Sequence, residues 1–322
     1  MESARIAAIS KLICKRKGYA CVDDIEPLEL LCSSLIPHHS SAAFSRFAFS
    51  SPEINRGTFL RCRAIRQAID VFIAQNTSSD CLIINFGAGL DTLAWRDGIS
   101  AARYIEIDKP EVCSLKIRLI LNNEALQQKL CISDSKFNTD SMISDRYSIY
   151  PCDISQFSTQ QLIEKCSIKG GMKVLIIFEC ILMYLDYKTK TNLISTLSDL
   201  NFSSLNVFLF EPINLDDKYG QNMIKSLKLH DDLDLEGLGD CGNIRNLLSL
   251  FNKDKFQFNN ASYYLMSDAF HKINKKLRQN IEKIEPLDER NLMDELFKHY
   301  CFVTLSHCST KLLDIKIIFD GI

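Results

Sequence analysis

The chain has 322 residues, of which 46% are apolar and 24% are charged. This length and composition fit one large globular domain and exclude a disordered or fibrous chain. Its 38 Lys and Arg residues against 40 Asp and Glu residues give a formal net charge of -2, which lacks the basic excess of a nucleic-acid-binding protein. The most apolar run, residues 174–178, is too short to span a membrane, and the N-terminus lacks the pattern of a signal peptide. We therefore expect a cytoplasmic or nuclear protein that binds neither membranes nor nucleic acid.

The 13 cysteines are an odd number and include no CxxC pair. Cys301 and Cys308 lie too far apart to form such a pair in a zinc site. We expect no metal site and interpret the cysteines as reduced thiols that pack as small apolar side chains.

Helical pieces are expected in residues 1–49, among them a helix over 28–35 with Pro27 in its first turn. The Ser-rich stretch 38–47 is typical of a surface loop, or of a lid over a site. A longer helix is predicted over 56–74, because its apolar residues recur on one helical face.

Strands that alternate with helices then predict a parallel α/β sheet. The apolar run 81–86 ends in Gly87-Ala88-Gly89, as a buried parallel strand that enters a glycine turn, and residues 91–95 should begin a helix. The polar stretch 133–145 is interpreted as a surface loop. Further strands are expected over 104–108, 147–154, 173–179 and 206–213, with helices from Pro110 and over 187–200.

The pattern changes after residue 214. Strand-like segments there suggest that the parallel sheet is finished by antiparallel edge strands. The expected elements are a helix over 218–229, an acidic loop over 230–242, and strands over 256–264, 301–307 and 313–319, with helices between the first two strands.

The glycine turn is the first chemical signal. The dinucleotide pattern G-x-G-x-x-G is not met, because Thr92 stands where the third glycine should be. Asp91 would also place a negative charge at the turn and repel a pyrophosphate, but it would not repel a ligand with a sulfonium and an ammonium group. This favours S-adenosylmethionine over NAD.

Acidic residues end the successive strands. Glu106 and Asp108 lie about 20 residues past the glycine turn, where an acid accepts hydrogen bonds from ribose hydroxyls. Asp153 follows the third strand and could accept from an adenine amino group. Glu179 ends the fourth, where a buried carboxylate needs a partner. Since ligands of open α/β sheets bind outside these strand ends, the acids predict a nucleoside ligand with a cationic group.

Several motifs resemble the leucine carboxyl methyltransferase family, from about residue 7 to residue 319, although residues 31–49 depart from its pattern. The motifs are SPEINRG (51–57) with Arg61, INFGAGLDTLAWR (84–96), YIEIDKP (104–110), FECILMYL (178–185), FEPINLDDKYGQNMI (210–224) and KHYC (298–301).

This resemblance implies a Rossmann-like class I methyltransferase fold, a mostly parallel sheet of the seven-stranded type with antiparallel edge strands. One domain would comprise an N-terminal helical lid (1–54), a cofactor-binding core (55–213) and a substrate-side insertion with the C-terminal strands (214–322).

The resemblance further implies that a monomer uses S-adenosylmethionine to methyl-esterify the C-terminal leucine of a protein phosphatase 2A-type catalytic subunit, leaving S-adenosylhomocysteine. The cofactor would contact the residues that match the family's binding positions, with Lys11 and Tyr184 near the acceptor carboxylate. The implied cofactor residues are Arg61 (which also reaches the acceptor), Gly87, Asp108 with Glu106 as the fallback, Asp153, Ile154 and Glu179.

An α-carboxyl group has a pKa of about 3.5, so the acceptor is already ionised and needs no general base. This agrees with the lack of a recognisable His or Cys catalytic motif; Arg61 and Lys11 would orient the carboxylate. Two alternatives remain open: a small-molecule O-methyltransferase of the same superfamily, and a non-catalytic protein that kept the fold. A tRNA wybutosine-pathway methyltransferase is not expected, because the chain is too short to hold the extra propeller of that relative.

Overall fold

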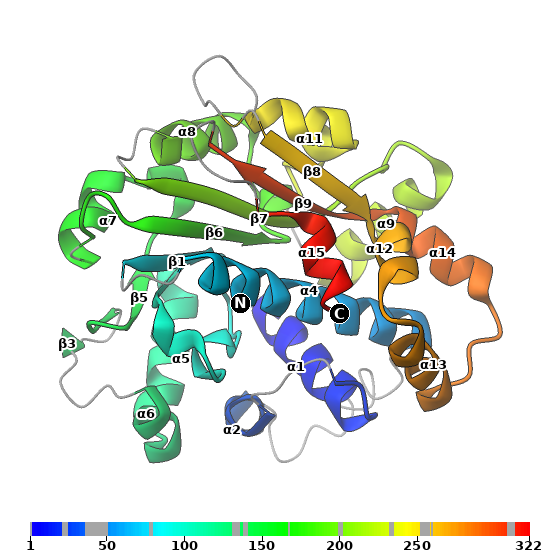
Figure 1. Cartoon of the computed structure of the whole chain (residues 1–322), viewed down its shortest axis with the longest axis horizontal. Helices are drawn as coiled ribbons and strands as arrows, with labels where there is room; N and C mark the ends of the chain where they lie inside the picture. The colour runs from blue at the N-terminus through cyan, green and yellow to red at the C-terminus, as the bar shows by residue number, and fades with distance from the viewer. Residues whose placement is uncertain are drawn as a thin grey trace.

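The computed structural model describes residues 2–20, 25–35, 51–76, 80–130, 136–137, 141–166, 168–198, 202–231, 235–251, 258, 260–307 and 313–322. A sheet runs through the molecule with helices packed on both faces, so the fold has three layers (Figure 1). The described strands form one nine-stranded sheet in the order β3-β4-β5-β2-β1-β6-β7-β9-β8. The predicted α/β class with a parallel centre is therefore confirmed.

The five central strands are mutually parallel, so their carboxyl ends meet along one side, here called the carboxyl edge. Phe86 of β1 pairs with Ile107 of β2 and with Phe178 of β6. This register brings the glycine turn, Asp108 and Glu179 out of the sheet side by side. The five strands are β1 (Cys81–Phe86), β2 (Arg103–Asp108), β5 (Tyr147–Pro151), β6 (Lys173–Glu179) and β7 (Ser204–Pro212).

Antiparallel pairing completes both sides of the sheet. Strand β9 (Tyr300–Ser306) lies antiparallel between β7 and β8 (Asn260–Leu265). On the opposite side, β3 (Lys136–Phe137) and β4 (Met142–Ile143) form a short hairpin against β5. The prediction of a plain loop over 133–145 is thus wrong, because buried Met142 anchors the segment to the sheet despite its polar neighbours.

Apolar helix faces cover the two sides of the sheet and form two large core clusters. Each fully buried Leu, Ile or Phe stabilises such a core by about 1.5–3 kcal/mol. Helices α4 (Pro52–Gln75), α5 (Pro110–Leu121) and α15 (Ile315–Asp320) pack on one face. Helices α7 (Thr159–Cys166), α8 (Tyr187–Ser198) and α11 (Ile244–Phe251) pack on the other.

The N-terminal helix α1 (Glu2–Arg16) packs on α4 and on α2 (Ile25–Leu35), on the α4 side of the sheet (Figure 1). The suggested lid segment, residues 38–47, lies outside the described residues. The other elements are η1 (Leu93–Trp95), η2 (Ile99–Ala101), α6 (Glu124–Leu130), η3 (Ile154–Gln156), η4 (Leu182–Tyr184), α9 (Lys218–Asp231), α10 (Leu238–Cys241), α12 (Met266–Lys272), α13 (Lys275–Ile284) and α14 (Arg290–Lys298).

Other predicted elements also differ from the structure. Within the acidic loop expected over 230–242, residues Leu238–Cys241 form helix α10. The strand expected over 313–319 is helix α15, whose side-chain cap Asp314 accepts from Lys316 N. Its buried residues Ile315, Ile318 and Phe319 follow a helical period, which a short apolar run does not reveal. The helix expected from residue 91 is only the 3-10 turn η1.

No described helix is long and apolar enough to cross a membrane. Within the same residues there is no cluster of His, Cys, Asp and Glu that could hold a metal ion. All eight described cysteines with placed side chains are free thiols and seven are buried, in agreement with packing as small apolar groups.

Candidate active site

The glycine turn after β1 is tightly covered. Gly87 has a left-handed φ of 66°, and a Cβ there would collide with Ile181 Cδ1. Gly89 is also left-handed, with φ of 58°, and a Cβ there would lie 3.2 Å from Ala4 Cβ of α1. Both positions therefore favour glycine for conformation and for space, and helix α1 lies directly against the turn.

Asp108 is tied to this turn. One carboxylate oxygen accepts from Gly89 N at 2.7 Å and the other from Lys109 N at 2.7 Å. Burial raises the pKa of Asp108, although both amides act in the opposite direction. The side chain thus stands at the carboxyl edge next to the glycine turn, as the sequence predicted.

Glu106, the fallback for Asp108, lies elsewhere. Its carboxylate is 2% exposed and forms an ion pair of 2.5 Å with Lys116, inside the layer between β2 and α5. Burial raises the pKa of Glu106, and Lys116 opposes that shift. Glu106 is therefore a core residue rather than a group at the carboxyl edge.

Asp153 and Ile154 follow β5, two strands away from β1. Asp153 caps the turn η3 by accepting from Ser155 N at 3.0 Å and from Ser155 Oγ at 2.9 Å. Ile154 is buried. Both residues lie at the same carboxyl edge as Asp108, but at its outer end.

Four charged side chains form a continuous network at the centre of the edge. Lys11 Nζ lies 3.1 Å from Asp91 Oδ2 and 3.7 Å from Glu179 Oε1, and Arg61 Nε lies 2.9 Å from the same Glu179 oxygen. We call these residues the edge network. Two cations from the helices α1 and α4 thereby meet two anions from the ends of β1 and β6.

The network is largely sealed, with side-chain exposures of 6% for Lys11, 5% for Asp91, 19% for Arg61 and 14% for Glu179. Burial by itself would lower the pKa of Lys11, but Asp91 and Glu179 outweigh it and the pKa is raised. Burial likewise opposes ionisation of Asp91, and Lys11 reverses that effect, so the pKa of Asp91 is lowered. Burial opposes the charge of Arg61 as well, but Glu179 outweighs it and the pKa of Arg61 is raised.

This pairing corrects one step of the sequence argument. Asp91 was expected to present an unbalanced negative charge that repels a pyrophosphate. In the structure it is buried beside Lys11, and Lys116 Nζ also donates to its backbone oxygen at 2.6 Å. The charge of Asp91 is compensated within the protein, so it does not by itself discriminate between cofactors.

Tyr184 lies in the turn η4 that follows β6, where its amide donates to Ile181 O at 3.1 Å. Its side chain is half-buried and packs on a small apolar cluster that the sequence did not predict. The cluster has a core of Met183, Leu215, Leu235 and Leu238.

Aromatic rings lie beneath the network. The Arg61 guanidinium carbon stands 6.0 Å from the centre of the Phe210 ring, at the end of β7. Phe210 in turn stacks on Tyr300 of β9 with an interplanar angle of 4°. Neither ring was named as a site residue from the sequence; the motif around Phe210 was the available signal.

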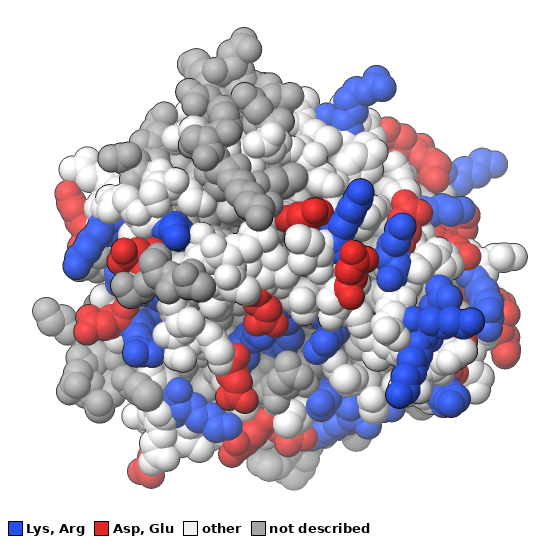
Figure 2. All heavy atoms as spheres, viewed as in Figure 1, with Lys and Arg blue, Asp and Glu red and all other residues white. Residues whose placement is uncertain are grey.

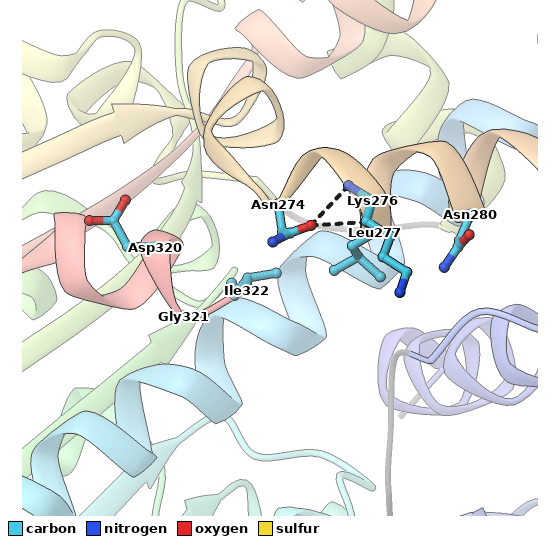
Figure 3. A pocket seen from close by; sticks show the side chains of 7 residues that line it. All are labelled: Asn274, Lys276, Leu277, Asn280, Asp320, Gly321 and Ile322. Atoms are coloured by element: carbon cyan, nitrogen blue, oxygen red, sulfur yellow. Dashed lines mark hydrogen bonds between the residues drawn. The ribbon is translucent and has the colours of Figure 1, made fainter.

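Figure 3 shows a separate hollow of about 350 Å³ between α13 and the end of α15. The oxygen of its residue Asn274 accepts from Lys276 N and Leu277 N and caps α13. None of the predicted site residues lines it, so it lies apart from the carboxyl edge. The lining residues are Asn274, Lys276, Leu277, Asn280, Asp320, Gly321 and Ile322.

The parallel central strands, the antiparallel β9 between β7 and β8, and the glycine turn after β1 together match the Rossmann-like fold of class I methyltransferases. A solved protein from Thermobifida fusca YX with a provisional methyltransferase name shares the fold, with a TM-score of 0.51 at 11% identity over 94% of this chain and 93% of that one.

The chain belongs to the leucine carboxyl methyltransferase family, because that family's sequence profile matches residues 31–198. It is therefore an S-adenosylmethionine-dependent methyltransferase, as the sequence resemblance indicated. The family's pattern extends into residues 31–49, which we had expected to depart from it. Lys11 lies outside the matched range, whereas the other predicted site residues lie within it.

Individual relatives agree with this membership. Leucine carboxyl methyltransferase 1 of Rattus norvegicus is 30% identical over 262 residues, which cover 78% of this chain and 76% of that protein. The Arabidopsis thaliana homolog of leucine carboxyl methyltransferase 1 is 29% identical over 307 residues, covering 92% and 85%. A tRNA wybutosine-synthesizing protein 4 of Schizosaccharomyces pombe is 26% identical over 280 residues, covering 82% of this chain but only 39% of that protein.

Proposed function

We propose that this enzyme is a carboxyl O-methyltransferase that esterifies the C-terminal leucine carboxylate of a protein phosphatase 2A-type catalytic subunit. The observation that carries the proposal is the edge network, in which Lys11 and Arg61 converge on Glu179 at the end of β6. Two cations beside one carboxylate suit ligands that bring both a carboxylate and an ammonium group.

The carboxyl edge fits S-adenosylmethionine. The left-handed glycine turn permits close approach of a ligand to the backbone. Asp108 would accept from ribose hydroxyls, and Glu179 would accept from the amino group. Asp153 and Ile154 would flank the adenine at the outer end of the edge. When bound, S-adenosylmethionine supplies an activated methyl group on a sulfonium.

Lys11 and Arg61 would bind and orient carboxylates, Arg61 toward both cofactor and acceptor and Lys11 with Tyr184 toward the acceptor. A leucine α-carboxylate is ionised at neutral pH, because its pKa is about 3.5, so the protein need not remove a proton. Orientation alone can supply on the order of 7–11 kcal/mol of a barrier. Esterification removes the acceptor's charge and thus weakens its attraction to both cations, which favours product release.

The contact between α1 and the glycine turn supports a lid role for residues 1–54, above a cofactor core of residues 55–213 and an acceptor side built from residues 214–322.

Basic and acidic side chains are interspersed on the face seen in Figure 2, as the net charge of -2 leads one to expect. We expect the acceptor tail to be recognised at the carboxyl edge, where the edge network lies.

The test is transfer of a labelled methyl group from S-adenosylmethionine to a phosphatase 2A catalytic subunit, intact or lacking its terminal leucine. We expect label on the intact subunit only, released by mild alkali as an ester is. Label on neither subunit, with tight S-adenosylhomocysteine binding, would contradict this acceptor and favour a small-molecule carboxylate or a non-catalytic role. Label on both would place the acceptor elsewhere on the phosphatase.

A further inference from the structure

The turn that joins β6 to η4 has an unusual backbone. Cys180 adopts a left-handed φ of 53°, and among the described non-glycine residues only Asn214 shares a positive φ. An L side chain rarely occupies this region unless the surrounding structure imposes it. The left-handed conformation therefore has to be held by contacts from outside the turn, because the turn contains no glycine that would adopt it without strain.

Glu211 anchors the turn from outside. Its Oε1 accepts from Ile181 N at 2.8 Å and from Leu182 N at 2.9 Å, directly after Cys180. The side chain is 0% exposed, and the neighbouring residue Phe210 accepts from Cys180 N at 2.8 Å. Strand β7 thus binds three successive amides of the turn, two of them through one carboxylate oxygen.

The turn carries groups on both sides of the candidate site. On one side Glu179 holds Arg61 and Lys11. On the other, Ile181 fills the space against Gly87 of the glycine turn. A rotation of the turn would therefore move the Glu179 carboxylate and the Ile181 side chain, which covers Gly87, together.

We propose that Glu211 is a positioning residue, whose carboxylate fixes the turn after β6 so that Glu179 and Ile181 face the cofactor edge. It touches neither cofactor nor acceptor in this assignment and acts through the two amides. The identity of the ligand in this inference rests on the proposed function. The behaviour of the turn does not depend on that function.

Ionisation of Glu211 gives the proposal a distinctive signature. Burial raises the pKa of Glu211 to about 7, against the opposing effect of the turn amides and Lys190. An ionised carboxylate accepts hydrogen bonds more strongly than a protonated one, so the turn tightens as the pH rises through this range. The other titratable groups that face Glu211 are the thiols of Cys180 and Cys301 and the phenol of Tyr300.

The first measurement follows the amide resonances of Ile181 and Leu182 by NMR in the ligand-free chain, from about pH 5.5 to about pH 8.5. In the wild type we expect both to titrate together with a midpoint near 7. In Glu211→Gln, which keeps an acceptor oxygen but cannot ionise, we expect neither to titrate. A titration that persists in the Gln variant, or is missing from the wild type, overturns the proposal.

The second measurement compares S-adenosylhomocysteine affinity and kcat/KM of the wild type, Glu211→Gln and Glu211→Ala. The Ala variant should lose on the order of 100-fold in kcat/KM through misplacement of the site, whereas the Gln variant should keep most activity and lose the rise in activity through neutral pH. Wild-type affinity and activity in the Ala variant would contradict the assignment.

Asn206→Ala is the matched control. Asn206 is also buried on β7 and accepts a backbone amide hydrogen bond, from Leu313 N at 3.1 Å, but it lies roughly 16 Å away along the strand. It should lose stability without losing affinity. If the amides titrate as expected but no phosphatase is methylated, the proposed acceptor fails and the role of Glu211 stands.

Discussion

Two buried ion-pair sites, one between β2 and α5 and one at the carboxyl edge, combine acidic and basic side chains with different consequences. Glu106 and Lys116 pair inside the layer between β2 and α5, both at most 2% exposed. The edge network pairs Lys11 and Arg61 with Asp91 and Glu179 where the strands end. The first site is closed to ligands and touches the second only through the hydrogen bond from Lys116 to the backbone oxygen of Asp91. The second can exchange its internal partners for those of a ligand.

The largest expected effect is on turnover. Arg61→Ala should reduce kcat/KM by at least about 1,000-fold, on the order of 4 kcal/mol of transition-state stabilisation. The reason is that the carboxylates of the cofactor and of the acceptor would both lose the guanidinium group that binds them. Methyl transfer is compared with that of Arg63→Ala, which lies two residues further along α4 and therefore points to the other side of the helix. Retained activity in Arg61→Ala would remove the edge network from the mechanism.

Lys116→Met should act on the fold instead. It leaves the Glu106 carboxylate buried without its cation, which costs about 3–5 kcal/mol of unfolding free energy. Urea unfolding measures this loss, and Glu106→Gln added to Lys116→Met should recover much of it. A large loss of S-adenosylhomocysteine affinity in the folded fraction of the variant would break the distinction between the two sites.

Glu211→Gln tests a third buried carboxyl group, one that backbone amides hold. In the folded chain its pKa is about 7, above the unfolded value of about 4.3. Between these values the folded state keeps a proton that the unfolded state has lost, so rising pH costs stability, by up to about 1.4 kcal/mol per pH unit. Gln removes this cost. The unfolding free energy of the variant minus that of the wild type should therefore rise through this window and level off above it.

Lys11→Met is expected to have the smallest effect, about a tenfold higher KM for the phosphatase acceptor or about 1.4 kcal/mol, because Lys11 is proposed to orient the acceptor carboxylate. The variant leaves Arg61 on Glu179 but removes one partner of Asp91. Methyl-transfer kinetics with Lys15→Met as the control separate Lys11 from its neighbour on α1. Equal KM values in the two variants would argue that Lys11 does not reach the acceptor.

The sequence predicted the central strands well, because apolar runs between turn signals are characteristic of buried parallel strands. Their common carboxyl edge also follows from parallel pairing, so the placement of Gly87, Asp108 and Glu179 could be anticipated. The sequence pattern alone could not predict which charged side chains pair with one another. Asp91 was read as an open charge because Lys11, 80 positions earlier, gives no local sign of pairing with it.

Helix α15 and the role of Glu211 were missed for related reasons. The run 313–319 is too short for its period to distinguish a strand from a helix. The apolar strand around Glu211 indicated that this acid is buried. It did not indicate that Glu211 binds a turn whose backbone is left-handed at Cys180, because a cysteine at position 180 does not predict that conformation.

The position of β9 has a consequence for biosynthesis. Strand β7, which carries Glu211, is flanked by β6 on one side and by β9 on the other, and β9 leaves the ribosome about 90 residues after β7 has been made. Until then one border of β7 offers unpaired backbone groups, and the anchor of the active-site turn stands beside an unfinished sheet. The nascent chain therefore cannot complete the sheet around this anchor until β9 has been made, and a chaperone that shields β7 would protect the enzyme during that interval.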